Sequence, residues 1–470
     1  MRILIFFALI GIINADSINI ISSSPLEEEL KESDVQKFIN EGLLDKDSAK
    51  DLLKNTKDEE ENERPLVNFY KHITADNNGD SNKEVPLLLE NVYGHIGFFG
   101  KTNLLNKNVG GSYGIFSGSI GLQYDFKESV FLDIGVYGIS GIVGGNLNNK
   151  FFVDSAVPVS TFIANRANVK YVAKNEFQDE IFDITAGRFL AKRDWIKNYI
   201  QGVSVNANYE WFKLWLDWVD EQAFVSREIL SDFRIFKYRY NDRWLISAGL
   251  GASVFGVDVL PYYYFFSGNL WAAGGKINAE FDFASKKWSN VTTLHYVYAN
   301  NKRDFGRQNK GKESQILWIE EILRWRSNNK MVSFGLGYIR VFGTTFELAS
   351  VGNMSRFDSN NTQGYGIMGI GGIDNGGNSS NMFFSKTQSF YGFVGFKIDD
   401  FSMMFLGRNS QGNNDFMQDL PTDNKLNQHQ YALSARYRII DGLYMGGAVA
   451  FMLENNVNKS YAKGYIEFKI

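Results

Sequence analysis

From about Val92 onward, apolar and polar residues alternate along the chain with a period of two. Between residues 114 and 126 the even positions are apolar or Gly, whereas much of the other face is polar, with Ser117, Ser119, Gln123 and Asp125. Successive side chains of a strand point to opposite faces, so this pattern predicts a strand with one apolar and one polar face. The same alternation recurs at 203–210, 212–218, 276–283 and 430–439.

The predicted strands are about ten residues long, which distinguishes a membrane barrel from a soluble sandwich. Soluble strands average about five or six residues, whereas a tilted strand that crosses a bilayer needs about 9–11. Strands in lipid must also close into a barrel, because an open edge leaves backbone groups without partners. Tight connections are expected at 127–129, 399–400 and 441–442, and long ones at 141–160, 302–314, 343–388 and 409–428. Short turns on one side and long loops on the other are typical of outer-membrane barrels.

The length of the patterned region predicts the number of strands. At about 21 residues per strand and connection, residues 92–470 would form about 18 strands, with 16 as the alternative. The predicted fold is therefore all-β, an antiparallel outer-membrane barrel wide enough to leave an aqueous channel. Its outer face would contact outer-membrane lipid and lipopolysaccharide.

The final strand is predicted at residues 461–470. Ala462, Gly464, Ile466, Phe468 and Ile470 share one face, and the sequence ends there. A strand in this place suits barrel closure and resembles the aromatic-rich C-terminal signal that the barrel insertion machinery recognises. That machinery is therefore an expected partner.

The first 15 residues have the features of a secretory signal peptide. Arg2 supplies a positive charge, residues 3–13 are apolar, and Ala15 is a small residue at the expected cleavage site. A buried first strand is the alternative. The chain has no Cys, which excludes disulfides and lipoprotein anchoring. We expect export and a location in the outer membrane.

Residues 16–64 differ sharply from the rest of the chain in charge. They hold 15 Asp/Glu and 7 Lys/Arg, a net charge of −8, although the whole chain carries −4. Ser33 and Asp47 suit the N-caps of two short helices. We expect a small acidic helical segment on the periplasmic side, followed by a linker at 65–91. It is either a solvated tail or a site that docks periplasmic partners or cell wall.

Neither enzymatic chemistry nor a cofactor is suggested by the sequence. The four His residues lack a second His or a carboxylate at ligand spacing, and no thiolate is available. We expect no enzyme activity, metal, cofactor or nucleic-acid partner.

One stretch resembles a known family. Gly187-Arg188-Phe189, Asp194-Trp195-Ile196, Tyr199-Ile200-Gln201-Gly202 and 212–216 (FKLWL) are similar to the signature region of the Helicobacter outer membrane protein family of the Hof type. The resemblance is strong over about residues 185–220 and looser elsewhere. It implies a porin-like barrel distantly similar to OprD-like porins. It also marks Arg188 and Asp194 as site candidates, for which pairing with each other or capping a turn is favoured over solute contact.

The expected function is passive diffusion of small hydrophilic solutes, and the alternative is an adhesin or structural surface protein anchored by a barrel. Arg436 and Arg438 are the leading pore-lining candidates, because alternation places both on the polar face of one strand. Solvated lumen residues without a selective role are the alternative. The loop at 343–389 is the segment expected to constrict or cover the pore.

Asn360 is a candidate glycosylation site. It lies in Asp358-Ser359-Asn360-Asn361-Thr362, which resembles the extended acceptor sequence of the Campylobacter-type periplasmic N-glycosylation system. The surrounding loop is polar, so a glycan there would face water.

Overall fold

The computed structural model describes the barrel region of the chain. The described residues are 92–104, 112–126, 129–143, 161–175, 180–191, 193–196, 198–209, 211–223, 225, 230–235, 244–267, 270–283, 287–301, 313–327, 329–346, 348, 381–413, 425–458 and 460–470. The predicted signal peptide, the acidic segment, the linker and Asn360 lie outside them.

Nearly all the described residues belong to strands. These are β1 Val92–Asn103, β2 Tyr113–Phe126, β3 Val130–Val143, β4 Phe162–Lys174, β5 Glu180–Leu190, β6 Tyr199–Tyr209, β7 Phe212–Ala223, β8 Arg234–Ile235, β9 Leu245–Val254, β10 Val257–Phe266, β11 Leu270–Asp282, β12 Trp288–Asn301, β13 Glu313–Ser327, β14 Lys330–Gly343, β15 Gln388–Ile398, β16 Phe401–Asn413, β17 Lys425–Ile440, β18 Leu443–Glu454, β19 Val457–Asn458 and β20 Tyr461–Lys469. A short 3-10 helix, η4, spans Asn381–Phe383.

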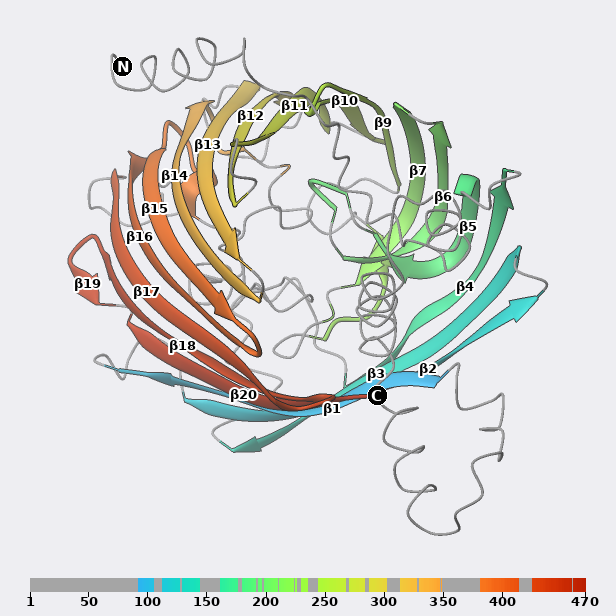
Figure 1. Ribbon diagram of the computed structural model, residues 1–470, viewed down its shortest axis with the longest axis horizontal. Helices are drawn as coiled ribbons and strands as arrows, with labels where there is room; N and C mark the ends of the chain where they lie inside the picture. Colours follow the sequence, from blue (N-terminus) through green and yellow to red (C-terminus); the bar gives the residue numbers. More distant parts are fainter. Residues whose placement is uncertain are drawn as a thin grey trace, which may run out of the picture.

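The strands form one closed ring (Figure 1). Each long strand pairs antiparallel with the next, β7 pairs with β9, and β18 pairs with β20. The ring closes where β20 pairs with β1, from His95 opposite Lys469 to Asn103 opposite Tyr461. Of the 20 strands in this sheet, β8 and β19 are two-residue additions to β7 and β18. The barrel therefore has 18 spanning strands, and the prediction of about 18 is confirmed.

The two rims of the barrel differ in their connections. One rim carries tight turns, such as Phe255-Gly256 between β9 and β10, whose φ values of 52° and 76° suit a two-residue hairpin. β1 begins and β20 ends at this same rim, where Gly94 and Ile470 exchange backbone hydrogen bonds. We call it the turn rim. The other, the loop rim, carries the longer connections, including those after β3 and β14.

The two faces of the wall differ as the alternation predicts. Outward side chains such as Ile120 and Phe451 are large, apolar and more than half exposed, at 57% and 56%. Inward side chains include Ser117, Gln428 and Gln430, which are buried. An apolar outer face and a polar lumen are what a barrel in lipid requires.

Candidate functional site

The connection between β5 and β6 folds into a compact turn. The backbone N–H of Ala191 donates to the carbonyl of Asn198 at 3.0 Å, and Arg193 and Ile196 exchange backbone hydrogen bonds at 2.9 and 3.3 Å. Trp195 and Ile196 are completely buried. A loop on the outside of a barrel would meet lipid or water, so this loop is directed into the lumen.

Arg193 fixes this inward loop to the wall. Its guanidinium donates to both carboxylate oxygens of Asp217 on β7, Nε to Oδ2 at 2.9 Å and Nη2 to Oδ1 at 3.0 Å. Nη2 also donates to Asn206 on β6 at 2.7 Å, and the guanidinium lies 4.5 Å from the centre of the Trp215 ring. A bidentate pair of this kind positions both partners as well as attracting them.

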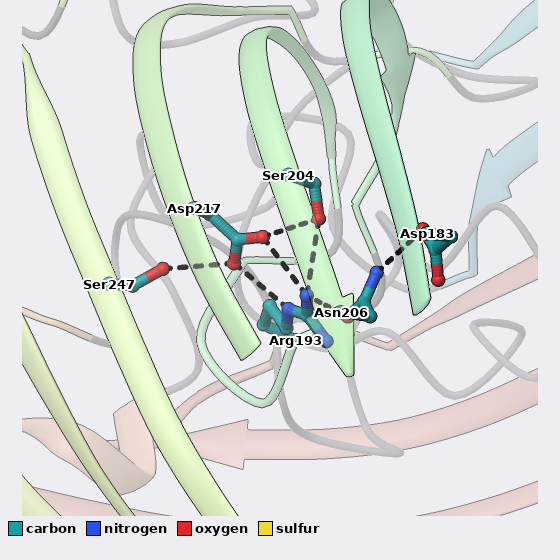
Figure 2. Close-up of polar contacts among 6 residues, drawn as sticks. All are labelled: Asp183, Arg193, Ser204, Asn206, Asp217 and Ser247. Carbon is teal, nitrogen blue, oxygen red and sulfur yellow. Dashed lines mark hydrogen bonds and ion pairs between the residues drawn. The ribbon is translucent and has the colours of Figure 1, made fainter. Parts of the chain in front are cut away.

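Asp217 is 2% exposed, and several hydrogen-bond donors compensate for the burial of its carboxylate. Ser204 donates to it at 2.7 Å and Ser247 at 3.0 Å, in addition to Arg193 (Figure 2). Asn206 continues the network to Asp183 on β5 at 2.9 Å. The network thus spans four consecutive wall strands, β5, β6, β7 and β9.

The tip of the loop reaches β10 and β11. Asp194 forms an ion pair with Lys276 at 2.8 Å, and Trp195 Nε1 donates to the Tyr262 hydroxyl at 2.7 Å. Tyr262 is hydrogen-bonded in turn to His295. These contacts place both charges of the Asp194–Lys276 pair on the lumen side of the wall, where they are partly exposed.

Apolar residues from the connection between β14 and β15 cover Trp195. Its ring lies 5.1 Å from that of Phe346 and 6.0 Å from that of Phe383, measured between ring centres. Leu348 and Met382 are buried in the same cluster. The described ends of the 343–389 loop therefore pack on the inward loop. Whether the rest of that loop constricts the pore stays a prediction, because residues 349–380 lie outside the described part.

β5 and β6 bend at a pair of glycines. Gly187 has a φ of 118°, and it pairs across the strands with Gly202. A Cβ on Gly187 would lie 2.2 Å from the Ala167 carbonyl oxygen, and one on Gly202 would lie 2.0 Å from that of Trp218. Both positions therefore require glycine, for its φ range or for its missing Cβ.

Beyond this bend, both faces of β5 are covered. Phe189 packs against the apolar cluster that contains Trp195, whereas Leu190 packs against a second cluster with Leu230 and Phe99. In Figure 1 the ribbon of β5 curves toward the interior of the ring. The glycine pair thus directs the loop-rim ends of β5 and β6 into the lumen.

The predicted site residues have identifiable places. Arg438 pairs at the turn rim with Asp400, through Nε at 2.7 Å, and with Asp441 at 3.5 Å. Arg436 is on the same inward face, with its guanidinium 4.3 Å from the centre of the Tyr444 ring. Their effect on selectivity stays a prediction.

Arg188 and Asp194 do not pair with each other. Arg188 donates to Gln201 at 2.8 Å and to the Ala164 carbonyl at 3.3 Å, whereas Asp194 pairs with Lys276. The pairing suggested from the sequence is therefore replaced by one partner on the next strand and one on β11. Whether either residue contacts a solute stays a prediction.

Arg193, Lys276 and Tyr262 are not recognisable as members of this site from the alternation of apolar and polar residues in the sequence. The sequence does contain one indication of this site. Trp195 and Ile196 are two large apolar residues in the connection between β5 and β6, which indicates that this connection is buried. Its partners could not be read from the sequence, because they are 67 to 82 positions further along the chain.

The described part of the chain offers no site for a metal ion. It holds no group of three or more His, Cys, Asp or Glu side chains placed to hold a metal ion. It also holds no helix long and apolar enough to cross a membrane.

A closed 18-stranded antiparallel barrel with a polar lumen and an inward loop defines the class of outer-membrane porins. Residues 90–469 match the family described as "Putative outer membrane protein", so the chain belongs to this Helicobacter-type family. No curated protein sequence matches the chain.

Solved porins share the fold. Acinetobacter baumannii OccAB4 has a TM-score of 0.58 and 10% identity, over 81% of this chain and 97% of that one. A BenF-like porin from Pseudomonas fluorescens Pf-5 has a TM-score of 0.58 and 9% identity, over 81% and 98%. Pseudomonas aeruginosa OccK8 (OprE) has a TM-score of 0.56 and 11% identity, over 81% and 98%. The resemblance to OprD-like porins expected from the sequence is thus confirmed at the level of the fold.

Proposed function

We propose that the protein is a channel for passive diffusion of small hydrophilic solutes. The observation that carries the proposal is the inward loop at 193–196, which presents charged side chains inside a closed barrel of 18 strands. A barrel of this width cannot be filled by wall side chains alone and leaves an aqueous lumen. The loop would then set the size and charge of the passage.

The charges at the inward loop favour small polar solutes of either sign. Arg193 is matched by Asp217, and Lys276 by Asp194, so neither sign is in excess at these two pairs. We therefore expect weak ion selectivity at this point. An adhesin anchored by its barrel would have no need of a hydrated, charged passage.

Conductance in planar bilayers tests this function. Purified, refolded protein should migrate as a heat-modifiable barrel and form channels on the order of a nanosiemens or somewhat below in molar salt. Boiled protein is the control. A folded and correctly inserted barrel that never conducts would contradict the channel and favour the adhesin.

A further inference from the structure

A polar cluster lies on the outer face of the wall, where β12 pairs with β13. Thr292 on β12 is directly opposite Glu321 on β13, and Glu321 is directly opposite Leu336 on β14. Directly opposite residues in a sheet share a face, and Leu336 is 72% exposed on the lipid-facing side. Asn290 is two residues before Thr292 on the same strand, so its side chain points the same way. We call Asn290, Thr292 and Glu321 the outer cluster.

Aromatic residues on the same two strands place the outer cluster near the middle of the lipid band. Trp288 and Trp325 pair across the strands near the turn rim, and Tyr296 lies toward the loop rim. Tryptophan and tyrosine are enriched at the two membrane–water interfaces. Thr292 is four residues from Trp288 and four from Tyr296, which at about 3.4 Å per residue and a tilt of about 40° is about 10 Å of depth on each side. Glu321 therefore faces hydrocarbon rather than water.

The hydrogen bonds within the outer cluster use only part of its polar groups. The Thr292 hydroxyl donates to Glu321 Oε2 at 2.7 Å, and the Asn290 amide donates to Oε1. A carboxylate has about four acceptor positions, and an amide nitrogen has two hydrogens. Among the described residues, Glu321 has no ion pair, and neither the second amide hydrogen nor Oδ1 of Asn290 has a hydrogen-bond partner.

Hydrocarbon cannot supply the missing partners. A polar group without a hydrogen-bond partner is costly in an apolar medium, and a charge on the lipid face of a barrel is most destabilising near the middle of the bilayer. The nearest outward side chains on the same strands, Leu294, Ile319 and Leu323, are apolar. The outer cluster therefore favours a covering partner that brings its own donors and acceptors at this depth.

The outer cluster is complementary to a second copy of itself. It holds both an unused donor, on Asn290, and unused acceptor positions, on Glu321. Copies in one membrane have their turn rims on the same side, so a two-fold axis between them is parallel to the membrane normal. Residues beside such an axis meet their own counterparts at the same depth. An identical cluster thus supplies both kinds of group that each cluster lacks, whereas a lipid tail supplies neither.

We propose that the chain forms a dimer through this face, with the two-fold axis beside the seam between β12 and β13. The Glu321 carboxyl group lies at that seam, because it accepts hydrogen bonds from Asn290 and Thr292 on the neighbouring strand. In the dimer, the Asn290 amide of each copy would donate its second hydrogen to the carboxyl group of the other. The two carboxyl groups would share one proton, which avoids two like charges at the axis. This interface goes beyond the channel function, because the outer cluster faces away from the lumen.

Subunit counting by single-molecule photobleaching, in vesicles of outer-membrane lipid at low protein density, tests the dimer. The chain has no Cys, so Lys425→Cys at the exposed start of β17 carries one fluorophore per copy, and most labelled vesicles should bleach in two steps. Glu321→Leu should lower the two-step fraction about fivefold, because it removes the acceptor at the axis. The matched control is Asn409→Leu, which removes an outward polar side chain from β16 and should leave the fraction unchanged.

Oxidative cross-linking in outer membranes tests the position of the axis. With copper phenanthroline as the oxidant, Thr292→Cys on β12 should give a disulfide-linked dimer. Leu433→Cys, on the outer face of β17, should not. Heat-modifiable migration shows that each variant is folded, and Asn290→Leu, which should also lower the two-step fraction, keeps the test decisive should Glu321→Leu fail to fold.

Three results would overturn the dimer: single-step bleaching of the chain with an intact outer cluster, an unchanged two-step fraction in the folded cluster variants, or equal cross-linking from positions 292 and 433. A cross-linked product whose mass is not twice that of the chain would also overturn it, because a different protein would then cover the outer cluster.

Discussion

The wall formed by β16–β18 and the loop-rim ends of β5–β7 differ in how their side chains are exposed. In the wall, outward apolar residues alternate with buried inward polar residues, whereas at the loop-rim end of β5 the residues on both faces are packed. In β17, Tyr431 and Leu433 face outward at 55% and 46% exposure, while Gln428 and Gln430 are buried on the other face. In β5, the consecutive residues Phe189 and Leu190 are both packed, against different apolar clusters. An alternating sequence pattern therefore distinguishes the two faces of a strand only where one face contacts lipid. Where a strand bends into the lumen, that contrast disappears.

Among the substitutions that test this difference, Gly202→Val should have the largest effect on stability and conductance. Its Cβ would lie 2.0 Å from the Trp218 carbonyl oxygen, so the bend must open or β6 must shift. We expect a loss of about 3 kcal/mol of unfolding free energy and a larger conductance, because the inward loop depends on this bend. Urea unfolding and single-channel recording measure the two effects.

The matched control is Gly407→Val in the straight wall. There a Cβ would meet the Tyr431 ring at 3.6 Å, an ordinary contact. Equal losses of stability at positions 202 and 407 would show that the bend has no special requirement for glycine.

Asp217→Asn should have an intermediate effect. It removes the negative charge that holds Arg193 through two hydrogen bonds, while preserving the shape of the side chain. We expect a loss of about 2 kcal/mol, as for other charge-assisted hydrogen bonds, and noisier channel currents from a loosened loop. Asp400→Asn removes the charge of one of the two carboxylate partners of Arg438 at the more exposed turn rim, and there we expect a loss below about 1 kcal/mol. A larger loss for Asp400→Asn would reverse the proposed ranking of the two regions.

Replacing Arg436 and Arg438 together by Glu should have the smallest effect. Both face the lumen, so reversing their charge should shift the reversal potential toward cation preference in a salt gradient. The shift should be limited to several millivolts, because Asp400 and Asp441 already neutralise part of the charge near Arg438. An unchanged reversal potential would place these arginines outside the part of the pore that selects ions.

The wall could be predicted from the sequence because its evidence is local. The alternating faces of β2, β7, β11 and β17 are contained within each strand, and their length alone indicates a membrane. The inward loop depends on contacts such as Trp195–Tyr262 and Asp194–Lys276, which join distant parts of the chain. Resemblance marked this stretch, but its pattern did not show which wall strands it would meet. Gly187 and Gly202 were both part of the family motif in the sequence. Their pairing across β5 and β6 can be seen only in the folded sheet.

The closure of the ring between β1 and β20 has a consequence for the order of folding. This seam joins Gly100 to Gly464, the first and last strands of the barrel, whereas nearly every other seam joins neighbours in the sequence. Contacts between residues far apart in sequence form slowly, because the loop entropy must be lost before the contact is gained. Until the nine residues of β20 are in place, β1 and β18 each present an unpaired edge, which favours pairing with other chains. Pairing of the final strand is therefore expected to be a late and slow step in folding. A chain that lacks this strand would form an open, aggregation-prone sheet rather than a less stable barrel.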